Sequence, residues 1–247
     1  MDPIIWRVAV FEQIDSTNTW VAEQARQGAD EGVVAVAHFQ SAGRGRLQRR
    51  WEAPPGSSLL SSVLLRPSLD ADHLQLCVAA VALSLRAALV RLAGVRPDLK
   101  WPNDLLVGDA KLAGLLAEVV TTEHATGMLV GFGVNLTSAP AGATSVREVT
   151  GMTLDPRGLL DIVLEELEPR RVQLDTDDGR ARLREEYERA LATLGRDVRV
   201  ELRDDACEGR ALRVDPAGRL VVEVDGVETV FFAGDVVHLR ARPGSSA

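Results

Sequence analysis

Cysteine is scarce in this chain of 247 residues. Its two cysteines, Cys77 and Cys207, lie far apart and form no Cys-x-x-Cys pair. Disulfide scaffolds and structural zinc sites need more sulfur ligands at closer spacing, so we exclude both. The four histidines also lack metal-ligand spacing. Unpaired cysteines are the rule in a reducing compartment, and we expect a cytoplasmic protein.

Long hydrophobic runs and targeting signals are missing as well. The longest uncharged apolar run covers residues 74–85, which is too short to span a bilayer. The first residues show no basic-then-apolar signal pattern. We therefore expect a core helix around residues 74–85 and no membrane partner.

Positive charge is in deficit, because the formal net charge is −8. Proteins that bind nucleic acids non-specifically are normally basic, so we expect no DNA partner. The sequence also contains no serine nucleophile elbow and no phosphate-loop lysine motif.

Against this acidic background, residues 41–51 concentrate four arginines, two glycines and a tryptophan: Ser41-Ala42-Gly43-Arg44-Gly45-Arg46-Leu47-Gln48-Arg49-Arg50-Trp51. The apolar run at residues 33–39 predicts a buried strand that leads into this loop. Glycine lets backbone N–H groups approach a ligand, and arginine fits carboxylate or phosphate. The pattern favours a small anion as ligand, with a solvated basic loop as the alternative.

A second motif combines an acid and a base on one predicted hairpin. If Gly108-Asp109 forms a two-residue turn, Leu106 lies opposite Lys111. Asp104 and Lys111 are then diagonal neighbours on one face. Such a pair can hold Mg²⁺ and neutralise a phosphoryl or carboxylate oxygen. The alternative is an ordinary surface ion pair.

Two further motifs place small and polar side chains together. One face of a predicted strand carries Gly131, Gly133 and Asn135. Because glycine has no side chain, this face leaves room for a flat ring or a chain of a ligand. The alternative is that the glycines only allow the strand to pack closely against a helix. Ser16-Thr17-Asn18 opens a predicted helix, where it caps the helix or binds a polar ring.

The spacing of apolar residues predicts an α+β fold. Helices are expected at residues 19–26, 73–92, 156–168 and 180–194, and strands at 5–14, 33–39, 59–65, 99–101, 105–107, 111–120 and 128–136. Five short strands follow at 198–202, 209–214, 220–224, 228–232 and 236–239, which is typical of a small barrel. We expect a catalytic domain at 1–194, a small domain at 195–240 and a disordered tail at 241–247.

These motifs, in this order, resemble the biotin protein ligases. The arginine-glycine loop of that family appears at residues 43–51, its Lys-Trp-Pro-Asn-Asp segment at 100–104, its Lys-Leu-Ala-Gly run at 111–114 and its glycine-asparagine strand at 131–135. The match covers most of the first 140 residues. Gln48 departs from it, because the family's loop has a third glycine there. No helix-turn-helix precedes the first predicted strand, which resembles the monofunctional class without a DNA-binding domain.

The resemblance implies a mixed-sheet, class II synthetase-like catalytic domain with flanking helices, plus a C-terminal SH3-like β-barrel. It also implies a two-step reaction. Biotin and ATP, with Mg²⁺, form biotinyl-5′-adenylate, and biotin is then transferred to a lysine of a biotin carboxyl carrier protein. A weak homodimer is possible in this family.

The family's motifs also imply roles for individual residues. Arg46 and Lys111 would be catalytic, and Asp104 would place Mg²⁺. The biotin site would comprise Ser16, Thr17, Asn18, Gln40, Gly43, Arg44, Lys111, Gly114 and Leu116. Nucleotide contacts would come from Arg44, Arg46, Trp51, Asn103 and Asn135.

Two other functions remain open from the sequence. A lipoate or octanoyl transferase shares the general fold by family resemblance, but the Lys-Trp-Pro-Asn-Asp segment and the arginine loop favour biotin. A non-catalytic regulator that binds a small anion is the second alternative, and the Asp104–Lys111 pair argues against it.

Overall fold

A seven-stranded mixed sheet forms the body of the protein in a computed structural model that describes residues 4–46, 49–122, 125–202, 205–232 and 234–239. The strand order is β1-β2-β3-β7-β6-β5-β4. Strands β1 and β2 are parallel, and all other neighbours are antiparallel. The strands are β1 Arg7–Ile14, β2 Val33–Gln40, β3 Ser58–Leu65, β4 Asp98–Lys100, β5 Asp104–Val107, β6 Ala110–Thr121 and β7 Thr126–Asn135.

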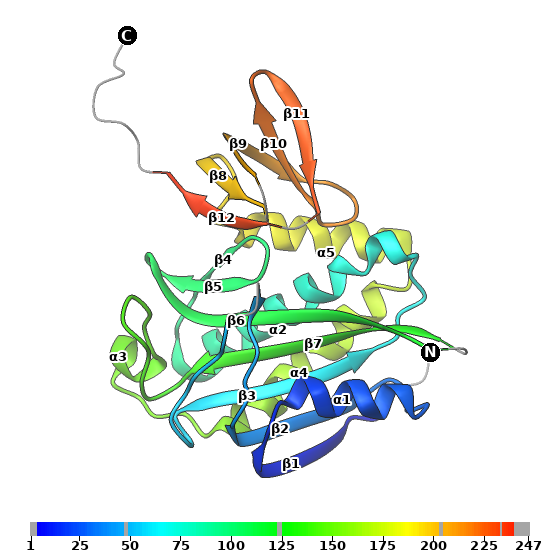
Figure 1. The fold of residues 1–247 in the computed structure, drawn as a ribbon, viewed down its shortest axis with the longest axis vertical. Coiled ribbons are helices and arrows are strands. Elements are labelled where there is room, and N and C mark those ends of the chain that lie inside the picture. The colour runs from blue at the N-terminus through cyan, green and yellow to red at the C-terminus, as the bar shows by residue number, and fades with distance from the viewer. Residues whose placement is uncertain (1–3, 47–48, 123–124, 203–204, 233, 240–247) are drawn as a thin grey trace.

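Helices cover both faces of this sheet (Figure 1). Helix α1 (Thr17–Arg26) packs on one face, against β2, β3, β6 and β7. Helices α2 (Gln75–Ala93) and α4 (Pro156–Gln173) pack together on the other, and α5 (Asp177–Ala190) lies against both of them. A 3₁₀ turn, η2 (Ala71–His73), leads into α2, and the short α3 (Val146–Thr150) follows β7.

Helix α2 is the core helix that the apolar run predicted. It is the one helix of the described ranges with the length and apolar composition to cross a membrane, and 67% of its apolar window is buried inside the protein. It ends at Gly94, which adopts a left-handed conformation with φ 65°. The thiol of Cys77 lies on this helix, and burial raises its pKa to about 12, so it is protonated and inert at neutral pH.

The last strands form a separate five-stranded antiparallel sheet in the order β11-β10-β9-β8-β12. They are β8 Asp197–Glu201, β9 Ala206–Val214, β10 Leu220–Val224, β11 Val227–Phe231 and β12 Asp235–His238. The buried core runs without a break from the large sheet into this one. Trp101 joins the two, since it is fully buried and its Nε1 donates to the Gly218 carbonyl at 3.1 Å.

The predicted α+β fold, a mixed sheet with flanking helices and a small C-terminal β-domain, is confirmed. Some boundaries differ. Helix α5 starts earlier than predicted because Thr176 caps it, accepting from the Gly179 N–H at 3.1 Å. It also ends earlier, because Ala192 N–H donates to the Leu99 carbonyl at 2.8 Å and draws the chain into a bridge with β4. Helix α3 was not predicted. The predicted tail at 241–247 lies outside the described residues, as does Gln48.

A buried ion network holds α4 against the sheet. The Arg171 guanidinium donates to both carboxylate oxygens of Glu31, at 2.5 and 2.8 Å, and to Asp175 at 2.5 Å. Glu31 also accepts from the Arg66 backbone N–H at 2.8 Å. Only 8% of the Arg171 side chain is exposed, so its charge is stabilised by these carboxylates rather than by water.

We expect Arg171→Ala to lower the free energy of unfolding by about 3–5 kcal/mol, because it leaves two carboxylates without a cation. Arg157→Ala is the matched control, since Arg157 pairs with Asp161 on the exposed face of the same helix. It should change stability by less than about 0.5 kcal/mol. Urea unfolding of both variants measures the difference, and equal losses would contradict the buried network.

Candidate active site

A pocket of about 140 Å³ lies on the α1 side of the large sheet. The start of α1, the arginine loop, the β5–β6 hairpin and the glycines of β7 surround it. Most of the predicted site residues line it: Ser16, Thr17, Asn18, Gln40, Arg44, Arg46, Trp51, Asn103, Asp104, Lys111, Gly114 and Leu116. The other two, Gly43 and Asn135, line a neighbouring cavity of about 590 Å³ that is shared with Trp51 and residues 138–140.

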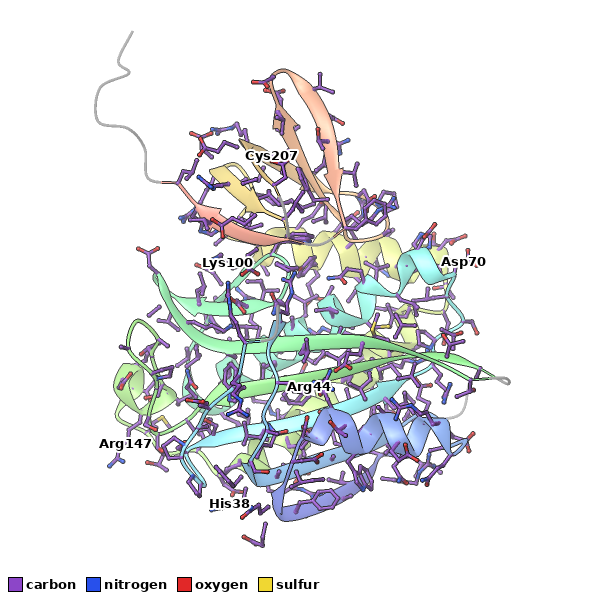
Figure 2. All side chains as sticks on the ribbon, viewed as in Figure 1. His38, Arg44, Asp70, Lys100, Arg147 and Cys207 are labelled. Atoms are coloured by element: carbon purple, nitrogen blue, oxygen red, sulfur yellow. The ribbon has the colours of Figure 1, made fainter. Side chains whose placement is uncertain are left out.

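The described part of the arginine loop folds back on itself as a narrow hairpin over the sheet. Arg44 and Arg50 form an antiparallel bridge, and Gly45 N–H donates to the Arg49 carbonyl at 2.8 Å. Trp51 N–H donates to the Gly43 carbonyl at 3.1 Å, so close that a β-carbon at Gly43 would overlap the Trp51 backbone. Arg44, labelled in Figure 2, lies in front of the large sheet above α1.

The arginines of this loop are held by three different parts of the chain. Arg44 pairs with Glu118 of β6 at 2.6 Å. Arg46 donates to the Asn103 side-chain oxygen at 3.0 Å and to the Gly234 carbonyl at 3.2 Å. Arg49 pairs with Asp235 at 2.6 Å. The loop is therefore attached to both sheets, although the side chains of Arg44 and Arg49 are still 45% and 68% exposed.

Arg46 is the most enclosed of these cations. Burial lowers the pKa of its guanidinium, while the carboxylates of Asp235 and Asp104 act in the opposite direction. The nearer of the two, Asp235, lies 3.8 Å from Arg46. Arginine remains charged at any physiological pH, so the effect of burial is to strengthen the attraction of Arg46 for an anion in the pocket.

The β5–β6 hairpin has the predicted geometry. Gly108 lies in the turn with φ 60°, and Leu106 pairs with Lys111. A bulge after Leu105 brings Asp104 opposite Gly114, and Lys111 Nζ lies 2.7 Å from Asp104 Oδ1. Asp104 and Lys111 thus meet on the pocket face, as expected, and the Lys111 ammonium lies 5.7 Å from the centre of the Trp51 ring.

The glycines of β7 leave space in which side chains from other segments pack directly against the sheet. A β-carbon at Gly131 would overlap the amide of Asn18. A β-carbon at Gly133 would lie 2.5 Å from the Trp51 ring. Protein side chains therefore occupy the space above both glycines, which corresponds to the close-packing alternative rather than to an open shelf for a ligand. At the end of β7, the Asn135 amide donates to the Thr144 carbonyl at 3.1 Å and borders the larger cavity.

The Ser16-Thr17-Asn18 segment faces the pocket instead of simply capping α1. Ser16 occupies the N-cap position, but its side chain makes no capping hydrogen bond. All three residues are at most 5% exposed. The backbone N–H and the hydroxyl of Thr17 both lie in hydrogen-bond contact with Gln40 Oε1, at 2.7 and 3.0 Å.

Asn103 follows a cis Trp101–Pro102 peptide. Its amide donates to the Leu115 carbonyl at 2.6 Å, and its oxygen accepts from Arg46. Asn103 thus links the arginine loop to β6.

No cluster of three or more metal-ligating side chains occurs among the residues that the structure describes. Asp104 is the carboxylate that the β5–β6 hairpin presents to the pocket. Mg²⁺ is commonly bound through one or two carboxylates plus substrate phosphates and water, so a lone Asp104 fits such an ion.

Sequence reasoning missed three polar residues that bond to side chains of this site, namely Ser62, Glu118 and Asp235. Glu118 lies two residues beyond Leu116 on the same face of β6, so the alternation of a strand could have revealed it. Ser62 interrupts an apolar strand, which is a weak signal. Asp235 carries no local signal, because it comes from the other sheet.

Comparison with known proteins identifies the family. The chain matches the model of the biotin/lipoate A/B protein ligase family over residues 10–135 and that of the biotin protein ligase C-terminal domain over residues 193–239. It is 37% identical to the biotin–[acetyl-CoA-carboxylase] ligase of Mycobacterium tuberculosis, over 95% of this chain and 90% of that one. It is 33% identical to the ligase of the same name from Paracoccus denitrificans, over 91% of this chain and all of that one.

Solved structures agree with this relationship. The biotin protein ligase of Aquifex aeolicus in complex with biotin and ATP superposes with a TM-score of 0.79 at 25% identity, over 95% of this chain and 99% of that one. Motifs, fold and relatives thus lead to one conclusion: the chain belongs to the biotin/lipoate A/B protein ligase family and is a biotin protein ligase.

Proposed function

We propose that the pocket forms biotinyl-5′-adenylate and that the residues named above perform this reaction. The protein is an ATP-dependent ligase. A carboxylate oxygen of biotin attacks the α-phosphorus of ATP, and pyrophosphate leaves. The amine of a carrier lysine then attacks the acyl carbon and loses a proton, and AMP leaves.

The observation that carries this proposal is the composition of the pocket lining, which combines neutral hydrogen-bonding groups, from Thr17 and Gln40, with the cations Lys111 and Arg46. Biotin has the same two kinds of group, an uncharged ureido ring and a carboxylate. We assign the first set to the ring, as the neutral end of the pocket, and the second set to the carboxylate, as its charged end.

At the neutral end, Ser16, Thr17, Asn18 and Gln40 bind the ureido ring, while Gly114 and Leu116 border the rest of biotin. Gln40 Oε1 already accepts from Thr17, so its amide N–H₂ is the group that remains for the ring carbonyl.

At the charged end, Lys111 binds the biotin carboxylate and the charge that develops on the α-phosphate. Asp104 fixes the Lys111 ammonium, 2.7 Å away, and would supply one ligand to Mg²⁺. When bound, Mg²⁺ neutralises the phosphate oxygens of ATP and favours pyrophosphate departure. Catalysis here consists of positioning and electrostatic stabilisation.

The larger cavity receives the nucleotide. It extends from the pocket past Trp51 to Asn135 and residues 138–140, and it offers both apolar surface and an amide. Trp51 packs against the adenine side, Asn135 contacts the nucleotide, and Gly43 lets the loop backbone close over both ligands. Arg44 and Arg46, with Asn103 behind Arg46, hold the phosphate of the adenylate.

The carrier is a biotin carboxyl carrier protein of an acetyl-CoA carboxylase. The names of the Mycobacterium and Paracoccus relatives support this choice. A catalytic unit at 1–194, a small C-terminal domain at 195–240, a cytoplasmic location, a weak homodimer and the absence of DNA binding remain predictions.

We expect Lys111→Ala to reduce biotin-dependent pyrophosphate release by at least about a hundredfold, because it removes a cation from the developing charge. The fold should persist, since both members of the Asp104–Lys111 pair are partly exposed. Lys100→Ala is the matched control, because Lys100 is the only other lysine of the chain. An unchanged rate in Lys111→Ala would exclude the assigned role.

We expect Arg46→Ala to release the adenylate about 10–100 times faster than the wild type, since a charge-assisted hydrogen bond to the phosphate is lost. The assay follows free biotinyl-5′-adenylate without carrier and labelling of an added lysine-rich bystander protein. A bystander is needed because the chain itself has only two lysines. Arg26→Ala, at the exposed end of α1, is the control, and wild-type retention by Arg46→Ala would refute the assignment.

A further inference from the structure

A fully buried hydroxyl lies beneath the pocket and has no part in the assignments above. It belongs to Ser62, in the middle of β3, where 0% of the residue is exposed. We propose that Ser62 is a positioning residue for biotin, which acts by fixing the orientation of Thr17 and Asn18. This inference rests on the proposed function, since it concerns the same ureido end of the pocket.

The sheet register puts Ser62 in the right place. Ser62 pairs with Gly131 across β3 and β7, and Gly131 pairs with Leu116 across β7 and β6. These three residues form one row beneath the start of α1. Because Gly131 has no side chain, the Asn18 side chain packs directly against the Gly131 backbone and lies between Ser62 and Leu116.

Every polar atom of the Asn18 amide then has a partner inside the protein. Its nitrogen donates to the Leu116 carbonyl at 3.3 Å and to Glu118 Oε1 at 2.8 Å. Its oxygen accepts from the Ser62 hydroxyl at 2.5 Å. An amide oxygen can only accept, so the Ser62 proton is directed to Asn18 and the amide has a single orientation.

The Thr17 hydroxyl is constrained by the same serine. It lies 2.7 Å from Ser62 Oγ and 3.0 Å from Gln40 Oε1. Ser62 and Thr17 have one hydroxyl proton each, and the Ser62 proton goes to Asn18. The Thr17 proton goes to one of its two oxygen neighbours, Gln40 Oε1 or Ser62 Oγ, so in either case it stays within the protein. The Thr17 hydroxyl oxygen therefore presents a lone pair to the pocket, where it can accept a hydrogen bond from an N–H group of a ligand.

A ureido ring has two N–H donors and one carbonyl acceptor. The Thr17 hydroxyl offers an acceptor for a ring N–H, and the Gln40 amide offers a donor for the ring carbonyl, so both kinds of ring group find a partner. Ser62→Ala would leave the Asn18 oxygen without its donor and Thr17 with one partner fewer. The unpaired Asn18 oxygen and the less constrained Thr17 hydroxyl would belong to residues that are 5% and 3% exposed, where water cannot replace the missing group.

Isothermal titration with biotin tests this proposal. We expect Ser62→Ala to weaken biotin binding about tenfold, which corresponds to about 1.4 kcal/mol. Steady-state kinetics should show a higher KM for biotin, with kcat at saturating biotin and KM for ATP unchanged. Ser84→Ala is the matched control, since it removes another fully buried serine hydroxyl, bonded to the Ala80 carbonyl in α2. It should bind biotin within twofold of the wild type.

A double-mutant cycle tests whether Ser62 acts through Thr17. The combined loss in Ser62→Ala/Thr17→Val should be clearly smaller than the product of the two single losses. If Ser62→Ala does not fold, Ser62→Cys keeps the volume with a weak donor and carries the same expectation.

Binding of biotin within twofold of the wild type by a folded Ser62 variant would overturn the proposal, as would single losses that simply multiply. Failure of the wild-type protein itself to bind biotin would instead overturn the proposed function.

Discussion

The charge of Arg46 is the constraint on which the arrangement of the active site depends. Its guanidinium lies where the arginine loop, the β5–β6 hairpin and the C-terminal sheet meet, and partial burial removes much of its water. Without ligand, the Asn103 oxygen, the Gly234 carbonyl and the Asp235 carboxylate compensate this charge. These three groups come from two sheets, so one cation links the small sheet to the catalytic pocket.

The pocket also differs in charge from the chain as a whole. The protein is acidic overall, yet its pocket concentrates Arg44, Arg46 and Lys111. Each of them is paired with a carboxylate, from Glu118, Asp235 or Asp104. In the proposed reaction, a carboxylate or phosphate ligand would enter a site in which each cation is already oriented. Preorganised charge of this kind needs little rearrangement when negative charge develops on a substrate.

The sequence predicted the local parts of this design. The Asp104–Lys111 pair follows from a two-residue turn, because the register of a short hairpin is set by its turn. Most helices and strands follow from apolar spacing. Contacts between segments that are distant in the sequence could not be predicted from apolar spacing. Ser62 meets Asn18 from 44 residues away, and Arg46 meets Gly234 from 188 residues away. Such contacts depend on the order of strands in the sheet and on the placement of the small sheet, which apolar spacing does not encode.

The most direct test of the account is the transfer reaction itself. The protein is incubated with biotin, ATP, Mg²⁺ and a biotin carboxyl carrier domain, and the carrier is analysed by intact-mass and peptide mass spectrometry. The account predicts one biotinyl group on a single carrier lysine, and none when ATP is omitted. A carrier that stays unmodified in the complete mixture, or that accepts lipoate in preference to biotin, would contradict it.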